Sequence, residues 1–168
     1  MRVVMSTRGF VGVVVDKKLG VGLFNHFDSY PGGLGADVID FARELKGSAL
    51  RAFKKNCKSV IALREGAPYA VEGVSDAENA LEVLAVLLTT EKLKIPQDRN
   101  FPKDSLFCEF AYVLDLDMKT IEFYKGFQDT EDHKPQKGNR FGCGVTKHKG
   151  CSGYYPCALI GKLKFSEA

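Results

Sequence analysis

A short segment near the N-terminus carries side chains that could take part in acid–base chemistry. Residues 25–30 read NHFDSY, and a proline and two glycines follow at once. Neighbouring side chains of a strand alternate between its two faces, so His26 and Asp28 would share a face if the strand runs this far. The pair could then transfer a proton, with Ser29 and Tyr30 beside it.

The same segment has a structural interpretation. Asp28 and Ser29 are good turn residues, whose side chains bond nearby backbone amides. Pro31 restricts Tyr30 to an extended conformation, and the glycines that follow permit positive φ. His26 could then be a hydrogen-bonded histidine of the core. Taken alone, these residue types favour an ordered turn over a site.

Two hydroxyls and an arginine stand at the start of the first predicted strand, where residues 6–9 read STRG. Ser6 or Thr7 could act as a nucleophile if a base such as His26 lay beside it. Arg8 could bind an anionic group. An ordinary strand with an exposed arginine explains the same residues without chemistry.

Charged side chains in the second half of the chain suggest two further sites. Asp115 and Asp117 would project from one strand face and could bind a metal or share a proton. No glycine-rich calcium loop follows them, so a solvated strand end is the simpler interpretation. Arg140, with Lys134 and Lys137 nearby, could receive a phosphate or a carboxylate, or could belong to a solvated loop.

The cysteines do not indicate a disulfide framework or a metal site. Their number is odd, and free thiols are the expectation in a reducing cytosol. They are Cys57, Cys108, Cys143, Cys151 and Cys157. The set of Cys143, His148, Cys151 and Cys157 lacks the paired C-x2-C spacing of structural zinc sites. No metal and no cofactor is therefore predicted.

Strands and helices that can position these groups follow from the hydrophobic pattern. Strands are predicted over 6–15 and 21–27 around a turn at 16–20, and over 109–117 and 121–127, which gives two hairpins. A further strand is predicted over 153–165, and a short one is possible over 59–65. Helices are predicted over 36–47, 49–57 and 75–90, the last with Ser75 and Glu78 at capping-box spacing. Two prolines predict a loop over 94–105.

These elements predict one α+β domain over residues 1–168. Its sheet is expected to be mainly antiparallel, built from two hairpins plus a C-terminal strand and covered by two or three helices. Residues 128–149 are polar and are predicted to form a long loop or a lid.

Composition excludes several classes of protein. The chain has 168 residues, of which 45% are hydrophobic and 27% charged, as in an ordinary globular domain. The net charge is only +3 and the lysines are scattered, so nucleic acid is an unlikely partner. The sequence shows no signal peptide and no apolar run of the roughly 18 residues that cross a bilayer, which predicts a cytoplasmic protein without a membrane segment.

The order of several motifs resembles a family of small, uncharacterised proteins from bacteriophages, bacteria and some microbial eukaryotes. The matching stretches are TRGFVGVVV, FNHFDSYPGGLG, YVLDLDMKTIEFYKGF and GNRFG followed by GYYPCALIGKLKF. They cover most of the chain, and the NHFDSYP-x-GLG block is the most specific. The resemblance implies a grouping without an established activity.

The layout is also similar, at the level of the fold, to N-terminal-nucleophile hydrolases such as the choloylglycine hydrolases. This similarity would place Ser6 at the nucleophile position and Asp28 at the early acidic position. It departs from those enzymes because no cysteine begins the strand and Ser6 is internal. The free α-amino group that serves them as base would require cleavage after Met5.

Three functions follow as hypotheses. The first is binding of a small ligand or a protein partner in a polar pocket around residues 25–30. The second is a small hydrolase that uses Ser6 or Thr7 with His26 and Asp28, and the third is a nucleotide or nucleic-acid binder. The candidate binding residues are Arg8, Asn25, Ser29, Tyr30, Asp115, Arg140 and Tyr155, and the oligomeric state is left open.

Overall fold

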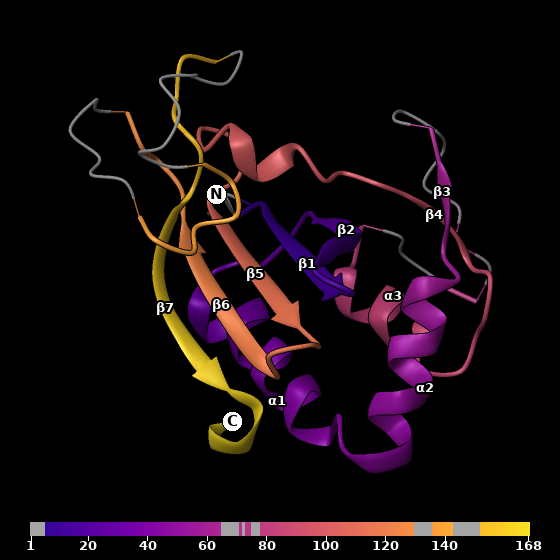
Figure 1. Cartoon of the computed structure of the whole chain (residues 1–168). Coiled ribbons are helices and arrows are strands. Elements are labelled where there is room, and N and C mark those ends of the chain that lie inside the picture. The colour runs from indigo at the N-terminus through magenta and orange to yellow at the C-terminus, as the bar shows by residue number, and fades with distance from the viewer. Residues whose placement is uncertain (1–5, 65–70, 72, 75–77, 130–135, 143–151) are drawn as a thin grey trace, which may run out of the picture.

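A mixed β-sheet forms the centre of the protein in a computed structural model that describes residues 6–64, 71, 73–74, 78–129, 136–142 and 152–168. Within these residues the sheet has five strands in the order β2-β1-β5-β6-β7 (Figure 1). The strands are β1 (Gly9–Val15), β2 (Lys18–Asn25), β5 (Phe110–Asp115), β6 (Thr120–Lys125) and β7 (Ala158–Lys164). The two predicted hairpins and the C-terminal strand are thereby confirmed.

The first hairpin is tighter than predicted. β2 begins at Lys18, so only Asp16 and Lys17 connect it to β1. Both residues have positive φ, 50° and 62°. This is the conformation that a two-residue hairpin turn needs, because it matches the right-handed twist of the strands.

The two hairpins join through a parallel pair that the sequence did not predict. β1 pairs with β5 in parallel, from Gly9 opposite Phe110 to Val14 opposite Asp115. The other three pairings of this sheet are antiparallel. Parallel neighbours require a long crossover connection. Here the crossover contains all the α-helices of the described chain.

Three helices cover one face of the sheet (Figure 1). They are α1 (Ala36–Glu44), α2 (Gly47–Lys58) and α3 (Ala80–Leu87). Gly47, predicted to stop the first helix, instead has a φ of 50° and begins α2. α3 begins later than predicted, because Asn79 is extended and accepts a hydrogen bond from Glu82 N as its N-cap. The predicted capping box depends on Ser75, which lies outside the described residues.

Each face of the sheet has its own hydrophobic core. The helical face contains alternate residues of β1 and β5, such as Val13 and Leu114, packed with Leu84 of α3. The other face contains Phe10, Tyr124 and a smaller group of loop residues. This alternation is the period of two expected for strands buried on both sides.

Loops, rather than helices, cover the second face. Phe141 packs into this core, and Gln136 makes two hydrogen bonds to the backbone of Leu159 at 2.8 and 3.0 Å. Residues 136–142 of the predicted lid are thus held against the sheet, and residues 130–135 and 143–149 lie outside the described part.

A second, small sheet corrects the prediction of a loop over 94–105. β3 (Ile61–Leu63) pairs in parallel with β4 (Lys94–Pro96). Pro96 is tolerated because it ends its strand, where a missing N–H disturbs the ladder least. A short helical turn, Phe101–Lys103, follows within the same predicted loop.

Asp117 connects three elements at the end of β5. Its carboxylate accepts hydrogen bonds from Lys17 N at 2.8 Å and from Lys54 Nζ at 2.6 Å. The bond from Lys54 and that from Lys17 lower the pKa of Asp117, and the bond to Asp117 raises the pKa of Lys54.

The Asp117→Asn variant is expected to lose about 1 kcal/mol of unfolding free energy at pH 7, a small value because the pair is partly exposed. A carboxyl with a lowered pKa stabilises the fold above its unfolded pKa, about 3.9 for Asp, and loses that effect as the pH falls through the folded value. Urea denaturation should therefore show a difference at pH 7 that disappears in acid. The exposed Asp40→Asn variant is the control, and an equal loss there would contradict the role of Asp117.

Candidate functional site

The segment 25–30 leaves the sheet at its first residue. β2 ends at Asn25, which pairs with Gly9 at the start of β1. Asp28 has a φ of 50°, so the chain is no longer a strand there. The prediction that His26 and Asp28 share a strand face is wrong, because the strand stops before either of them.

Asn25 is the central residue of this turn. Its side chain is buried, with Nδ2 donating to Phe27 O at 2.5 Å and to Ser29 Oγ at 2.9 Å. Its Oδ1 accepts from Ala80 N, at the start of α3, at 3.0 Å. A single buried amide thus ties the end of β2 to the turn and to the N-terminus of a helix.

Ser29 connects the turn to the sheet through hydrogen bonds of its backbone. It is fully buried, and its backbone N–H donates to Thr7 O at 3.3 Å. Its carbonyl accepts from the Tyr112 hydroxyl at 2.8 Å, and burial raises the pKa of that phenol. Hydrogen bonds hold this loop, but the Ser29 hydroxyl contacts the Asn25 side-chain amide and the carbonyl oxygens of Asn25 and Phe27, not the backbone N–H groups that were predicted.

The glycine-rich stretch folds into a short helical turn, Pro31–Gly35, that leads into α1. Asp28 O accepts from Leu34 N at 2.8 Å, and Tyr30 O accepts from Gly33 N at 3.0 Å. A side chain at Gly33 would approach Asp28 O to 2.4 Å, so only glycine fits at this position. The Tyr30 ring is exposed and lies over these glycines.

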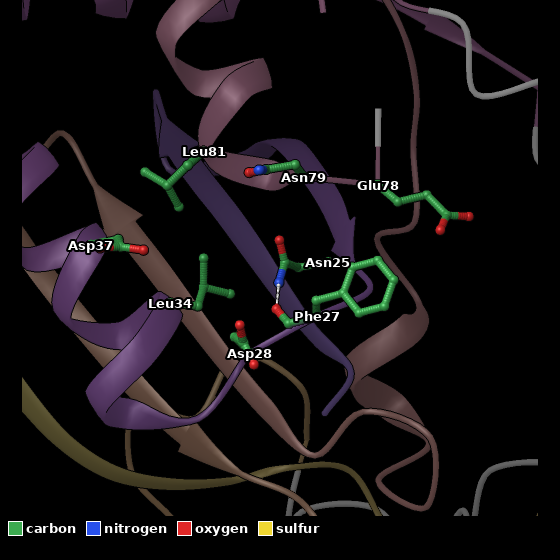
Figure 2. A pocket seen from close by; sticks show the side chains of 8 residues that line it. All are labelled: Asn25, Phe27, Asp28, Leu34, Asp37, Glu78, Asn79 and Leu81. Carbon is green, nitrogen blue, oxygen red and sulfur yellow. Dashed lines mark hydrogen bonds between the residues drawn. The ribbon is translucent and has the colours of Figure 1, made fainter. Parts of the chain in front are cut away.

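A pocket of about 220 Å³ opens between this turn, α1 and the start of α3 (Figure 2). It is lined by Asn25, Phe27, Asp28, Leu34, Asp37, Glu78, Asn79 and Leu81. Figure 2 shows Asp37 on α1 and Asp28 on the turn, with Leu34 between them and Leu81 above. Three of the eight lining residues are acidic and none is basic. The pocket is therefore suited to a small positively charged group.

His26 lies outside this lining and pairs with one of its acidic residues. Its Nδ1 is 3.2 Å from Glu78 Oε2, and its backbone N–H donates to Glu78 O at 3.0 Å. In Figure 2 the Glu78 carboxylate is turned away from the middle of the pocket. The partner of His26 is thus Glu78, not Asp28.

The predicted nucleophiles are not aligned with the imidazole. The Ser6 hydroxyl donates to the carbonyl oxygen of His26 rather than to its ring. Thr7 contacts the turn through its backbone carbonyl, which accepts a hydrogen bond from Ser29 N. Arg8 lies with its guanidinium 5.5 Å from the centre of the Phe107 ring, a cation–π contact on the surface.

Two other candidate residues lie at the far end of the sheet. Asp115 pairs with Val14, five residues along β1 from Gly9 and Asn25, which is about 16 Å at 3.3 Å per residue. Arg140 donates to Asp115 Oδ2 and to Glu122 Oε2, the latter at 2.7 Å. The expectation that Asp115 joins the cluster around residue 25 is wrong, and Arg140 belongs to this separate ion cluster.

The remaining candidates have structural partners. Tyr155 is buried and joins Ser105 and Gln128 through backbone hydrogen bonds. Asp115 Oδ1 accepts from the amides of Asp117 and Met118, which makes it a turn cap. Among the described residues no group of three metal-ligating side chains is close enough to hold an ion. Cys143, His148 and Cys151 of the weak zinc set lie outside those residues.

The sequence analysis missed half of the pocket. Asp37, Glu78 and Asn79 line it, yet they belong to segments that the sequence did not connect with residues 25–30. The sequence does place Asp37 in the first turn of a predicted helix, where an acidic residue suits the helix dipole. Asparagine is a favoured N-cap residue, but the sequence pattern predicted the N-cap at Ser75 instead of Asn79.

Compared with family models, curated proteins and solved structures, the chain shows no match. The resemblance to the phage and bacterial family and the similarity to N-terminal-nucleophile hydrolases therefore stay predictions. In the part of the chain that the structure describes, no helix is long and apolar enough to cross a membrane.

Proposed function

We propose that the protein binds a small, positively charged ligand in the acidic pocket, which comprises the lining residues named above. The observation that carries the proposal is that Asp28 and Asp37 line one concavity whose lining contains no basic residue. Asp28 and Asp37 are both exposed, so each attracts a cation only modestly, and the effect comes from two carboxylates at one concavity. An ammonium or guanidinium group is the chemistry that these residues favour.

The size and the apolar part of the pocket limit the ligand further. About 220 Å³ is below the 300–1,000 Å³ of pockets that hold drug-sized molecules. Leu34, Leu81 and Phe27 offer apolar surface beside the carboxylates. A short alkyl amine or an amino-acid-sized guanidine fits this combination better than a nucleotide.

The test compares ligands that differ only in charge. Butylamine, putrescine and agmatine are expected to raise the melting temperature, whereas butanol and butyrate are not, because a ligand that binds the native state stabilises it. Asp28→Asn and Asp37→Asn should each weaken amine binding about two- to fivefold in calorimetric titration, which corresponds to about 0.5–1 kcal/mol.

Asp40→Asn is the matched control for these variants. Asp40 lies on the same helix as Asp37, pairs with Arg43 at 2.8 Å and is not part of the pocket lining. Its amine affinity should equal that of the wild type. Binding of butyrate in place of the amines, or an equal loss in Asp40→Asn, would contradict the proposal.

The hydrolase stays as a second candidate because His26 and Glu78 form an imidazole–carboxylate pair 3.2 Å apart. Such a pair can orient a general base, but the Ser6 hydroxyl donates to the carbonyl oxygen of His26 and not to its ring. The N-terminal-nucleophile mechanism uses the α-amino group as base instead and needs Ser6 as a new N-terminus. Intact mass spectrometry of the protein purified from cells tests this requirement. A chain that retains Met1 would contradict the N-terminal-nucleophile mechanism.

A further inference from the structure

Two cysteine side chains lie close together in the smaller core, away from the acidic pocket. Cys108 lies just before β5 and Cys157 just before β7, and both are fully buried. The Cys157 thiol donates to Cys108 O at 3.4 Å, across a sequence separation of 49 residues. The Cys108 thiol donates to Phe110 O, also at 3.4 Å.

The Cys157 side chain thus lies against the backbone of Cys108. Burial, first, and the hydrogen bond with the Cys157 thiol, second, raise the pKa of Cys108 well above its ordinary value. Few thiolates are therefore present while Cys108 and Cys157 stay buried, and the thiolate is the reactive form. Cys57 is a useful contrast, since burial alone raises its pKa to about 12 and it lies in the core on the other face of the sheet.

We propose that Cys108 and Cys157 form a reversible disulfide when a hydroperoxide reaches them. The peroxide first oxidises one thiolate to a sulfenic acid and leaves as water or an alcohol. The second thiol then attacks that sulfur, the S–S bond forms, and the sulfenic oxygen leaves as water. Altogether the two thiols lose two protons and two electrons, which the peroxide O–O bond accepts.

The disulfide would cross-link a part of the fold where several loops already contact one another. Cys157 N donates to Pro102 O at 2.9 Å, and Ser105 N donates to Tyr155 O at 3.2 Å. A covalent bond there closes a loop that contains β5 and β6 and so constrains the unfolded chain. Oxidation is expected to raise the melting temperature by about 5–10 °C.

The experiment oxidises the full-length folded protein with hydrogen peroxide and maps its peptides by mass spectrometry without reduction. The expected product is a cross-linked Cys108–Cys157 peptide pair that has lost two hydrogen atoms, with the rise in melting temperature reversed by dithiothreitol. Because opening of this part of the fold limits the reaction, mild urea should accelerate it. The Cys57→Ala variant should form the same cross-link, whereas Cys108→Ala should not.

Peptide mapping of the wild type decides the proposal even if Cys108→Ala fails to fold. Cross-links that join only Cys143 or Cys151 to other cysteines would overturn it. The same holds if Cys108 and Cys157 gain oxygen atoms instead of losing hydrogen, or if both remain open to alkylation after the other cysteines have reacted.

Discussion

The Gly9→Ala variant is expected to lose roughly 2–3 kcal/mol of unfolding free energy, as overpacked buried positions do. A Cβ at Gly9 would lie 2.5 Å from Ser29 Cβ and 2.9 Å from Phe110 O. Neither neighbour is the flexible end of a long side chain, so the backbone itself must move. Urea denaturation of the variant and the wild type, monitored by circular dichroism, measures the loss.

The Gly161→Ala variant is the matched control. Gly161 also lies within a strand of the same sheet, but a Cβ there meets no atom within 4 Å. Alanine at this position should leave the stability unchanged or raise it by about 0.5 kcal/mol, since glycine weakens a strand through its conformational freedom. Equal losses in both variants would show that the contact with Ser29 is not the cause.

Gly9→Ala also tests the connection between the turn and the acidic pocket. Displacing Ser29 removes the acceptor of the Asn25 amide, which holds the start of α3 through Ala80. Amine affinity measured where the variant is still folded should therefore fall as well. Retained affinity would mean that the pocket does not depend on this hydrogen-bond chain.

Local patterns in the sequence were sufficient for the hairpins and for the turn. Residues 109–117 alternate, and Pro31 with its glycines restricts the backbone wherever the chain folds. These are properties of neighbouring residues, so no knowledge of the tertiary structure was needed.

The parallel β1–β5 pair could not be predicted in this way. Gly9 and Phe110 are neighbours in the sheet but are about 100 residues apart in the chain. Both strands are apolar on both faces, so their patterns do not specify a partner or a direction. β4 was missed for a related reason, because its pairing with β3 outweighs the local effect of Pro96.

The acidic pocket depends on the same long-range information. Asp28 comes from the turn, Asp37 from α1 and Glu78 from the segment before α3. Only the packing of the helices on the sheet brings these residues together. Motifs of neighbouring residues therefore indicated only the part of the pocket formed by the turn. The sequence did not connect Asp37 and Glu78 with that turn.

The Arg140→Met variant is expected to lose about 2–3 kcal/mol, because it leaves two buried carboxylates without their shared cation. Asp115 and Glu122 are 3% and 1% exposed. Burial acts to lower the pKa of Arg140, but the bond to Glu122 and the charge of Asp115 raise it overall. Tyr124 and Lys162 still donate to Glu122, and the Arg140 side chain is 29% exposed, which keeps the loss below that of a fully buried pair.

An exposed arginine is the matched control for this loss of charge pairing. Arg43→Met, which removes one exposed pair with Asp40, should cost less than about 0.5 kcal/mol. An equal loss in the two variants would show that the burial of Asp115 and Glu122 is not the cause of the effect.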